Sequence, residues 1–250
     1  MKAIKNLNIK NVTHCFAHKK VLHNINLNIQ EGNITAIVGR SGCGKSTLLN
    51  LVAKLIDLQS GSILNGFHDT GVLFQDPRLL PWKTVAENIS WGLKAKKVAK
   101  HQRDKILKDL AREVGLLKED FNKYPHELSG GMKQRVAMAR SFATKPDLLL
   151  LDEPFSALDI GLKDELHQLL INKIEQQKLT VLFITHDLME AVKLADHIVV
   201  LAHNPGRVVY TDTSDLPRAQ RNHQYQYTTV MKLLDIDFVK QAFRTNKLDD

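Results

Sequence analysis

The fold of this chain is decided by the stretch Gly39-Arg-Ser-Gly-Cys-Gly-Lys-Ser-Thr47. It matches the pattern G-x-x-x-x-G-K-[ST] in full, with Gly39, Gly44, Lys45 and Ser46 at the fixed positions. The five residues before it, Ile-Thr-Ala-Ile-Val, are an apolar run that predicts a short buried strand, and the residues after it predict a helix. A strand, a glycine-rich loop and a helix in this order are the context in which the pattern binds phosphate.

The chemistry of this loop predicts a nucleotide site. Its glycines let successive backbone N–H groups point at a phosphate chain, and the helix N-terminus adds the positive end of its dipole. We expect Lys45 to reach the β- and γ-phosphates of ATP and the hydroxyl of Ser46 to bind Mg²⁺. The expected nucleotide-binding residues of the loop are Gly39, Arg40, Ser41, Gly42, Cys43, Gly44, Lys45, Ser46 and Thr47.

The composition is that of an ordinary globular protein. The 250 residues are 43% hydrophobic and 25% charged, enough for one α/β domain with a proper core. No apolar run approaches the length of about 18 residues that a membrane helix needs, and the N-terminus does not resemble a signal peptide. We therefore expect the chain to stay in the cytosol and to touch a membrane only through a partner. Two cysteines, too few for a disulfide framework, agree with a reducing compartment.

The formal net charge of +8 raises the question of nucleic-acid binding. The lysines are scattered, however, and the densest run, residues 94–105, has none of the interleaved aromatic residues that stack on bases. We interpret this run as a solvated helical face and expect no direct contact with nucleic acid.

The order of the remaining patterns predicts an α/β fold. Residues 4–29 alternate apolar and polar side chains, as in half-exposed antiparallel strands, and residues 61–66 predict a short hairpin-like segment. A helical block over residues 85–143 interrupts the strands and ends in a helix from Val136 to Ala143. Beyond it, strands alternate with helices, which predicts a mostly parallel sheet covered by helices. The strands expected around and after this block cover residues 71–74, 148–151, 180–184 and 197–201.

These patterns also predict how the chain is organised. We expect a single domain over residues 1–250. Its core with the antiparallel strands comprises residues 1–75 and 144–215, residues 76–143 form an inserted helical subdomain, and residues 216–250 form a C-terminal extension. The extension contains one amphipathic helix over residues 228–243 and no motif that we can interpret.

Polar residues follow four of the predicted strands. Gly39, Gln75, Asp152 and His186 each come after a strand, so the topology predicts that all four lie at one edge of the sheet. Asp152 is suited to hold Mg²⁺, Gln75 to bridge water and metal, and His186 to donate to the γ-phosphate. Glu153, the next residue, would polarise the attacking water. Taken one at a time, each residue has an equally good structural interpretation; it is their combination with the phosphate loop that predicts catalysis.

Taken together, the motifs resemble those of the nucleotide-binding subunit of an ABC transporter, over about residues 1–215. That resemblance implies a P-loop (RecA-like) core with a mostly parallel sheet, an antiparallel β-subdomain and an inserted α-helical subdomain. It assigns catalytic roles to Glu153, His186, Gln75 and Lys45, and a metal site to Ser46, Gln75 and Asp152. The motifs are the Walker A loop 39–47, the Q-loop Gln75, the signature 128–134, the Walker B strand 148–152, the D-loop 156–159 and the switch His186.

The resemblance further implies a head-to-tail homodimer in the ATP-bound state. ATP would lie between the Walker A loop of one subunit and Ser129 and Gly131 of the other. The family stacks adenine on an aromatic residue, usually tyrosine, in its first strands, and Phe16 occupies that place here without the hydroxyl. Periodicity alone favours a core position for Phe16, so both interpretations stay open at this stage.

Two further stretches, residues 74–82 and 204–207, are similar to importers of the nitrate, sulfonate and taurine group. This similarity implies an ATPase that powers uptake of a small anion through two transmembrane permease subunits and, through them, a periplasmic or surface solute-binding protein. The subunit would lie peripherally on the cytoplasmic face of the cell (inner) membrane.

Two alternatives stay open from the sequence. A soluble ABC ATPase acting on nucleic acid or ribosomes usually carries tandem ATPase domains or long coiled-coil insertions, and neither is present here. An exporter subunit is less consistent with an ATPase that is not fused to a membrane domain. We therefore favour the importer.

Overall fold

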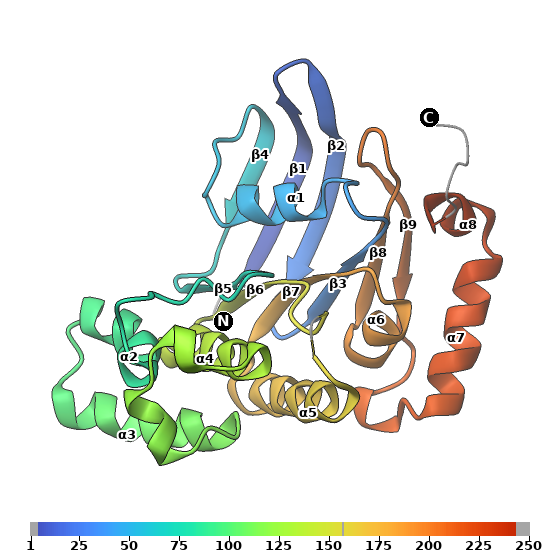
Figure 1. Cartoon of the computed structure of the whole chain (residues 1–250). Helices are drawn as coiled ribbons and strands as arrows, with labels where there is room; N and C mark the ends of the chain where they lie inside the picture. The colour runs from blue at the N-terminus through green and yellow to red at the C-terminus, as the bar shows by residue number, and fades with distance from the viewer. Residues whose placement is uncertain (1–4, 157, 244–250) are drawn as a thin grey trace. The chain divides into compact units, whose positions relative to one another are not determined.

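The computed structural model describes residues 5–156 and 158–243, and the chain divides into two compact units (Figure 1). Unit 1 combines residues 1–67 with residues 180–250, and unit 2 comprises residues 68–179. Among the described residues, no helix is long and apolar enough to cross a membrane.

Unit 1 contains a sheet in the strand order β7-β3-β8-β9. The strands β3, β7 and β8 run parallel, and β9 joins the edge antiparallel to β8. Every residue of β3 and β7 is buried, as expected for apolar strands covered on both faces. The predicted parallel arrangement is confirmed here, whereas β9 was not predicted. The strands are β3 (Ile34–Val38), β7 (Thr180–Thr185), β8 (His197–Leu201) and β9 (Val208–Thr213).

A second sheet in unit 1 is antiparallel, in the order β2-β1-β4. Strands β1 (Asn6–Phe16) and β2 (Lys19–Gln30) alternate buried and exposed residues, as predicted. The hairpin-like segment expected at residues 61–66 is wrong, because β4 (Ser60–Asn65) is a single strand paired with β1. Gly61 does not make a turn. It has φ +90°, and a Cβ there would lie 2.5 Å from the carbonyl oxygen of Lys10, so this glycine permits a close approach of two backbones.

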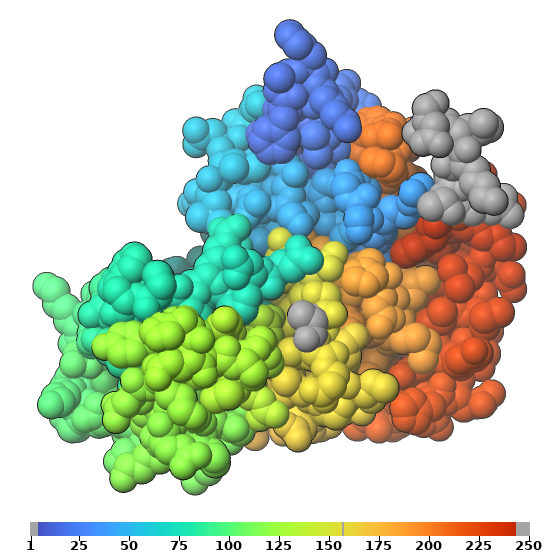
Figure 2. Space-filling view, in the orientation of Figure 1, coloured from blue at the N-terminus to red at the C-terminus, as the bar shows by residue number. Residues whose placement is uncertain are grey.

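The helices of unit 1 are α1 (Lys45–Val52), α6 (Leu188–Leu194), α7 (His223–Asp235) and α8 (Asp237–Phe243), with a 3₁₀ turn at Arg218–Gln220. The single helix expected over residues 228–243 is wrong. The backbone is extended at Ile236, which separates α7 from α8, and α7 begins earlier, where the side chain of Asn222 accepts the N–H of Tyr225. Helix α7 packs beside α6, and in Figure 2 the red C-terminal helices lie on the surface.

Unit 2 pairs two parallel strands, β5 (Thr70–Leu73) and β6 (Leu148–Asp152), and β6 is buried throughout. A capping box at Thr84 and Glu87 starts the first helix of this unit. The helix expected from Val136 starts earlier, at Gly130, because the side chain of Ser129 caps it. The helical elements are α2 (Val85–Ala95), α3 (Lys100–Glu113), 3₁₀ turns at Lys118–Asn122 and Pro125–Glu127, α4 (Gly130–Ala143) and α5 (Ile160–Gln177).

A buried arginine holds the segment before α7 to the rest of unit 1. The guanidinium of Arg221 donates to the carbonyl oxygens of Val192 (3.3 Å), Lys193 (3.5 Å) and Ala195 (2.7 Å), at the end of α6. The last carbonyls of a helix have no partner within the helix, so Arg221 satisfies groups that would otherwise be unpaired. Its Nε also donates to the carbonyl of Leu216, at 2.8 Å.

Asp196 completes this attachment. Its carboxylate accepts the backbone N–H of Ile34 at 2.8 Å, at the start of β3, and forms ion pairs with Arg218 and Arg221. Burial lowers the pKa of Arg221, and the attraction of Asp196 opposes that shift. Arg221 is therefore bonded directly to the end of α6, and Arg218 and Arg221 are linked to the first residue of β3 through Asp196.

We expect Arg221→Met to destabilise the protein by about 2–4 kcal/mol, because it leaves buried carbonyl oxygens without a donor and removes one cation from Asp196. Urea unfolding followed by circular dichroism measures this loss. Arg112→Met is the matched control: the Arg112 side chain is 81% exposed, and its pair with Asp109 should contribute less than about 0.5 kcal/mol. Equal stability of the two variants would contradict this assignment.

Candidate nucleotide-binding and hydrolysis site

The Walker A loop lies between β3 and α1. Its two fixed glycines have positive φ values and close contacts that favour glycine. Gly39 has φ +155°, and a Cβ on it would lie 2.5 Å from the carbonyl oxygen of Leu201. Gly44 has φ +99°, and a Cβ there would lie 2.7 Å from Cδ2 of Leu22. A Cβ at Gly39 would collide with a backbone carbonyl, and the positive φ of Gly44 would strain any other residue, so both fixed glycines have a physical cause.

Lys45 organises the inside of the loop. Its side chain is buried, and its ammonium donates to the carbonyl oxygens of Gly39 at 2.7 Å and Arg40 at 3.0 Å. In the described structure no side chain caps α1, and its first turn contains no acidic residue. The N–H groups and the positive end of this helix are therefore suited to a negatively charged ligand.

The other loop residues differ in exposure. Ser41, Gly42 and Ser46 are exposed, whereas Arg40 and Thr47 are half-buried. Cys43 is buried, and burial raises the pKa of its thiol against the opposing charge of Lys45. The thiol therefore stays protonated and acts as a small packing residue.

His186 lies at the same sheet edge as the Walker A loop. Strand β7 pairs with β3, and Thr185 lies opposite Val38, so the exposed His186 and Gly39 follow paired residues. The turn that carries the histidine is anchored, because the Thr185 hydroxyl donates to the carboxylate of Glu190 at 2.7 Å and accepts the N–H of Asp187 at 3.0 Å. The prediction that these two strand ends meet is confirmed within unit 1.

Phe16 ends β1 and is 50% exposed. Its ring meets that of His14 edge to face, with the ring centroids 4.8 Å apart. The interpretation of Phe16 as a core aromatic is therefore wrong. A ring that is half exposed offers surface on which a flat base can stack.

In unit 2, Gln75 and the acidic pair Asp152-Glu153 lie together. Leu73 of β5 lies opposite Leu151 of β6, so both strands end at one edge, and Nε2 of Gln75 donates to Oε2 of Glu153 at 3.4 Å. Asp152 is buried at the end of β6. Glu153 has φ +44°, a conformation that a glutamate rarely adopts and that is often found at functional sites.

The backbone around Glu153 is held by its neighbours. The N–H and the hydroxyl of Ser156 both point at its carbonyl oxygen, at 3.3 and 3.1 Å. The buried side chain of Gln134, on α4, donates to the carbonyl of Pro154 at 2.8 Å. This bond joins the helix of the signature to the loop of the proposed base. We did not predict a role for Gln134, although its place as the last residue of the signature was a signal for one.

The signature residues open α4. Ser129 is the exposed N-cap, and its hydroxyl accepts the N–H of Met132 at 3.3 Å. A Cβ at Gly131 would lie 3.3 Å from Leu162, so the helix start lies close to α5. Asp159 caps α5 through the N–H of Leu162 at 2.9 Å, a contact that the sequence analysis did not predict. Ala157, in the D-loop, lies outside the described residues.

The candidate residues thus form two groups. Phe16, residues 39–47 and His186 belong to unit 1. Gln75, Asp152, Glu153, Ser129 and Gly131 belong to unit 2. Convergence of both groups on a single site stays a prediction.

Comparison with known proteins identifies the family. Residues 22–156, more than half of the chain, match the family model described as ABC transporter. The chain is 44% identical to the aliphatic sulfonates import ATP-binding protein of Pectobacterium atrosepticum, over 84% of this chain and 78% of that one. It is 42% identical to the taurine import ATP-binding protein of Escherichia coli O157:H7, over 79% and 81%.

Solved structures support the same fold. A dimeric structure of the ATP-binding cassette MJ0796, in a post-hydrolysis state bound to ADP and Pi, matches with a TM-score of 0.75 and 30% identity, and it covers 83% of this chain and 98% of that one. The predicted α/β cassette fold is therefore confirmed, and so is the resemblance based on the motifs. This chain belongs to the ABC transporter family.

Proposed function

We propose that this chain is the ATP-hydrolysing subunit of an importer that takes up a small anion, such as an aliphatic sulfonate, taurine or nitrate. The observation that carries the hydrolytic role is the contact between Gln75 and Glu153, whose carboxylate follows a buried strand in a constrained backbone conformation. The names of the sulfonate and taurine import relatives favour uptake over the alternatives of an exporter or an ATPase acting on nucleic acid or ribosomes.

ATP would bind through its phosphates to residues 39–47, with its adenine on the exposed face of Phe16. The geometry that supports this is the buried ammonium of Lys45 within the loop and the uncapped start of α1. Two copies would associate head to tail, and Ser129 and Gly131 of one copy would complete the phosphate site of the other. The dimeric state of the similar cassette supports this arrangement.

The donor chemistry of the candidate metal residues fits Mg²⁺. Ser46 offers a hydroxyl, Gln75 an amide carbonyl and Asp152 a carboxylate, and Mg²⁺ prefers oxygen ligands. When bound, the ion would neutralise charge on the β- and γ-phosphates. The exposed hydroxyl of Ser46, at the start of α1, is compatible with that role.

Hydrolysis would depend on four side chains. Lys45 places a positive charge in the loop that holds the phosphates, and Glu153 polarises the attacking water while Gln75 orients it. His186 donates a hydrogen bond to the γ-phosphate. The backbone contacts of Ser156 and Gln134 fix the loop of Glu153, so the carboxylate need not reorganise before reaction.

We propose that residues 1–250 act as one ABC ATPase domain. Residues 1–75 and 144–215 form its core, residues 76–143 a helical subdomain, and residues 216–250 an extension. The subunit would lie on the cytoplasmic face of the cell membrane, bound to two permease subunits that receive cargo from a solute-binding protein. Residues 74–82, which include Gln75 and in which Trp82 is 67% exposed, are a surface suited to the permease.

Glu153→Gln should lower ATP turnover by about a hundredfold or more, because an amide cannot accept the proton of the water. Binding of ATP should stay within about threefold, and the variant should accumulate as an ATP-bound dimer on size exclusion. Steady-state phosphate release and nucleotide titration measure the two effects. The matched control is Glu175→Gln, an exposed residue of α5. Normal turnover by Glu153→Gln would show that another group is the base.

Ser129→Glu should reduce ATP turnover of the subunit assembled with its permease by at least about tenfold, because a carboxylate would face the γ-phosphate of the opposite copy. ATP binding to the isolated monomer should not change, since the Walker A loop of that copy is intact. Ser60→Glu, at an exposed position of β4, is the control. Undiminished turnover after Ser129→Glu would reject the composite site.

Uptake itself is measured with membrane vesicles that contain the subunit and its permease. We expect ATP-dependent accumulation of labelled taurine or alkanesulfonate, and none with Glu153→Gln. Co-purification with ribosomes or DNA instead of a membrane protein would contradict the importer assignment.

A further inference from the structure

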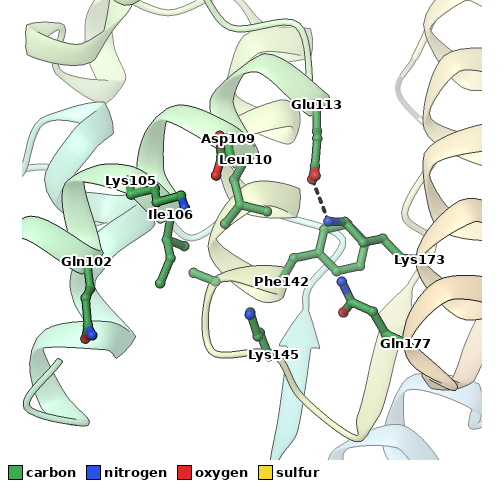
Figure 3. A pocket seen from close by; sticks show the side chains of 11 residues that line it. Gln102, Lys105, Ile106, Asp109, Leu110, Glu113, Phe142, Lys145, Lys173 and Gln177 are labelled. Atoms are coloured by element: carbon green, nitrogen blue, oxygen red, sulfur yellow. Dashed lines mark ion pairs between the residues drawn. The ribbon is translucent and has the colours of Figure 1, made fainter.

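Unit 2 contains a cavity of about 500 Å³ (Figure 3). It lies among α3, the end of α4 with the segment that follows, and α5. Its volume is within the range of about 300–1,000 Å³ typical of small-molecule sites. None of the residues assigned to ATP, metal or catalysis lines it. The lining residues are Gln102, Lys105, Ile106, Asp109, Leu110, Glu113, Phe142, Ala143, Lys145, Lys173 and Gln177.

One side of the cavity is apolar. Leu110, Phe142 and Ala143 are buried, and Ile106 is half-buried one turn before Leu110 on α3. Together they offer a leucine, an isoleucine and an aromatic ring to the same space (Figure 3). A ligand with an apolar body would gain about 25 cal/mol for each Å² that it buries here.

Two of the charged lining residues neutralise one another. The ammonium of Lys173, a buried residue, donates to Oε2 of Glu113 at 2.7 Å (Figure 3), and it lies 6.0 Å from the centre of the Phe142 ring. This pair leaves no net charge. The carboxylate of Asp109 is engaged by Arg112, at 3.5 Å, which does not line the cavity.

Two lysines remain. Lys105 enters from α3, and Lys145 enters from the turn after α4, where it is held at φ +50° with its N–H on the carbonyl of Phe142 at 2.9 Å. Within the described parts of the chain, neither ammonium forms an ion pair or a hydrogen bond. Lys105 and Asp109 are one helical turn apart and still do not pair. The cavity therefore presents two ammonium groups without an ion-pair partner beside an apolar wall, and its lining carries three lysines against the carboxylates of Asp109 and Glu113, with the amides of Gln102 and Gln177 at its sides.

We infer that this cavity binds a small organic anion, with a carboxylate or sulfonate group against Lys105 and Lys145 and an apolar body against Ile106, Leu110 and Phe142. The two ammonium groups favour an anionic ligand, because a neutral ligand would not pair with them. The apolar wall selects against inorganic anions, which gain nothing from it. The pairing of Lys173 with Glu113 closes one side and holds α5 to α3.

The test uses the full chain without nucleotide, so its outcome is independent of the proposed function. The probes are naphthalene-2-sulfonate and naphthalene-2-carboxylate, with naphthalene-2-methanol as a neutral analogue of the same body, titrated by calorimetry. We expect saturable one-site binding of the anions and at least about tenfold weaker binding of the alcohol. The tighter of the two anions identifies the head group that the site prefers.

Matched variants locate the binding. Lys105→Gln combined with Lys145→Gln should weaken both anions at least about tenfold and leave the alcohol unchanged. Lys108→Gln combined with Lys118→Gln removes two exposed lysines that do not line the cavity, and affinity should stay within about twofold. Ile106→Asp should abolish anion binding, with thermal unfolding showing that the variant is folded. Absence of saturable binding, or equal binding by the two double variants, would overturn the inference.

Discussion

The organisation of unit 1 depends on one steric constraint, the close passage of the Walker A backbone past its neighbours. The space beside Gly39 is filled by the carbonyl of Leu201, and the space beside Gly44 by the side chain of Leu22. Leu201 ends β8 and Leu22 lies in β2, so the loop conformation requires both sheets of the unit to be in place. The ammonium of Lys45 donates hydrogen bonds to two carbonyl oxygens inside the loop, those of Gly39 and Arg40. A phosphate site built in this way exists only in the folded unit.

The positions of the site motifs could be predicted where the motif consists of residues close together in the sequence. The Walker A loop, the strand ends before Gln75 and Glu153, and the pairing that brings His186 beside Gly39 all follow from local patterns and the rule that parallel strands end at one edge. The N-cap at Ser129 follows from its residue type, although we placed the start of that helix too late. In each case the residues close by in the sequence were enough to predict the local structure.

Predictions failed where distant residues decide the local structure. Gly61 reads as a turn, yet its role is to admit the backbone of β1, which no local pattern reveals. The break at Ile236 is not marked by glycine or proline, and the apolar spacing continues through it. Strand β9 pairs with β8 at the sheet edge, where its half-exposed residues lack the apolar run of the buried strands. Strand pairing outweighed local propensity at Gly61 and in β9.

The basic run at residues 94–105 illustrates the same limit for charge. Its lysines were interpreted as a solvated face, and all of them are exposed. Lys96, for example, pairs with Asp69 at the surface. Lys105 is exposed as well, but α3 packs on α4, and its side chain also lines the cavity that Lys145 lines, 40 residues away in sequence. An organic anion bound there would place its charge near two ammonium groups that have no ion-pair partner and its apolar body against the wall. The lysines are scattered in the sequence, and only the packing of the helices places Lys105 and Lys145 at one cavity.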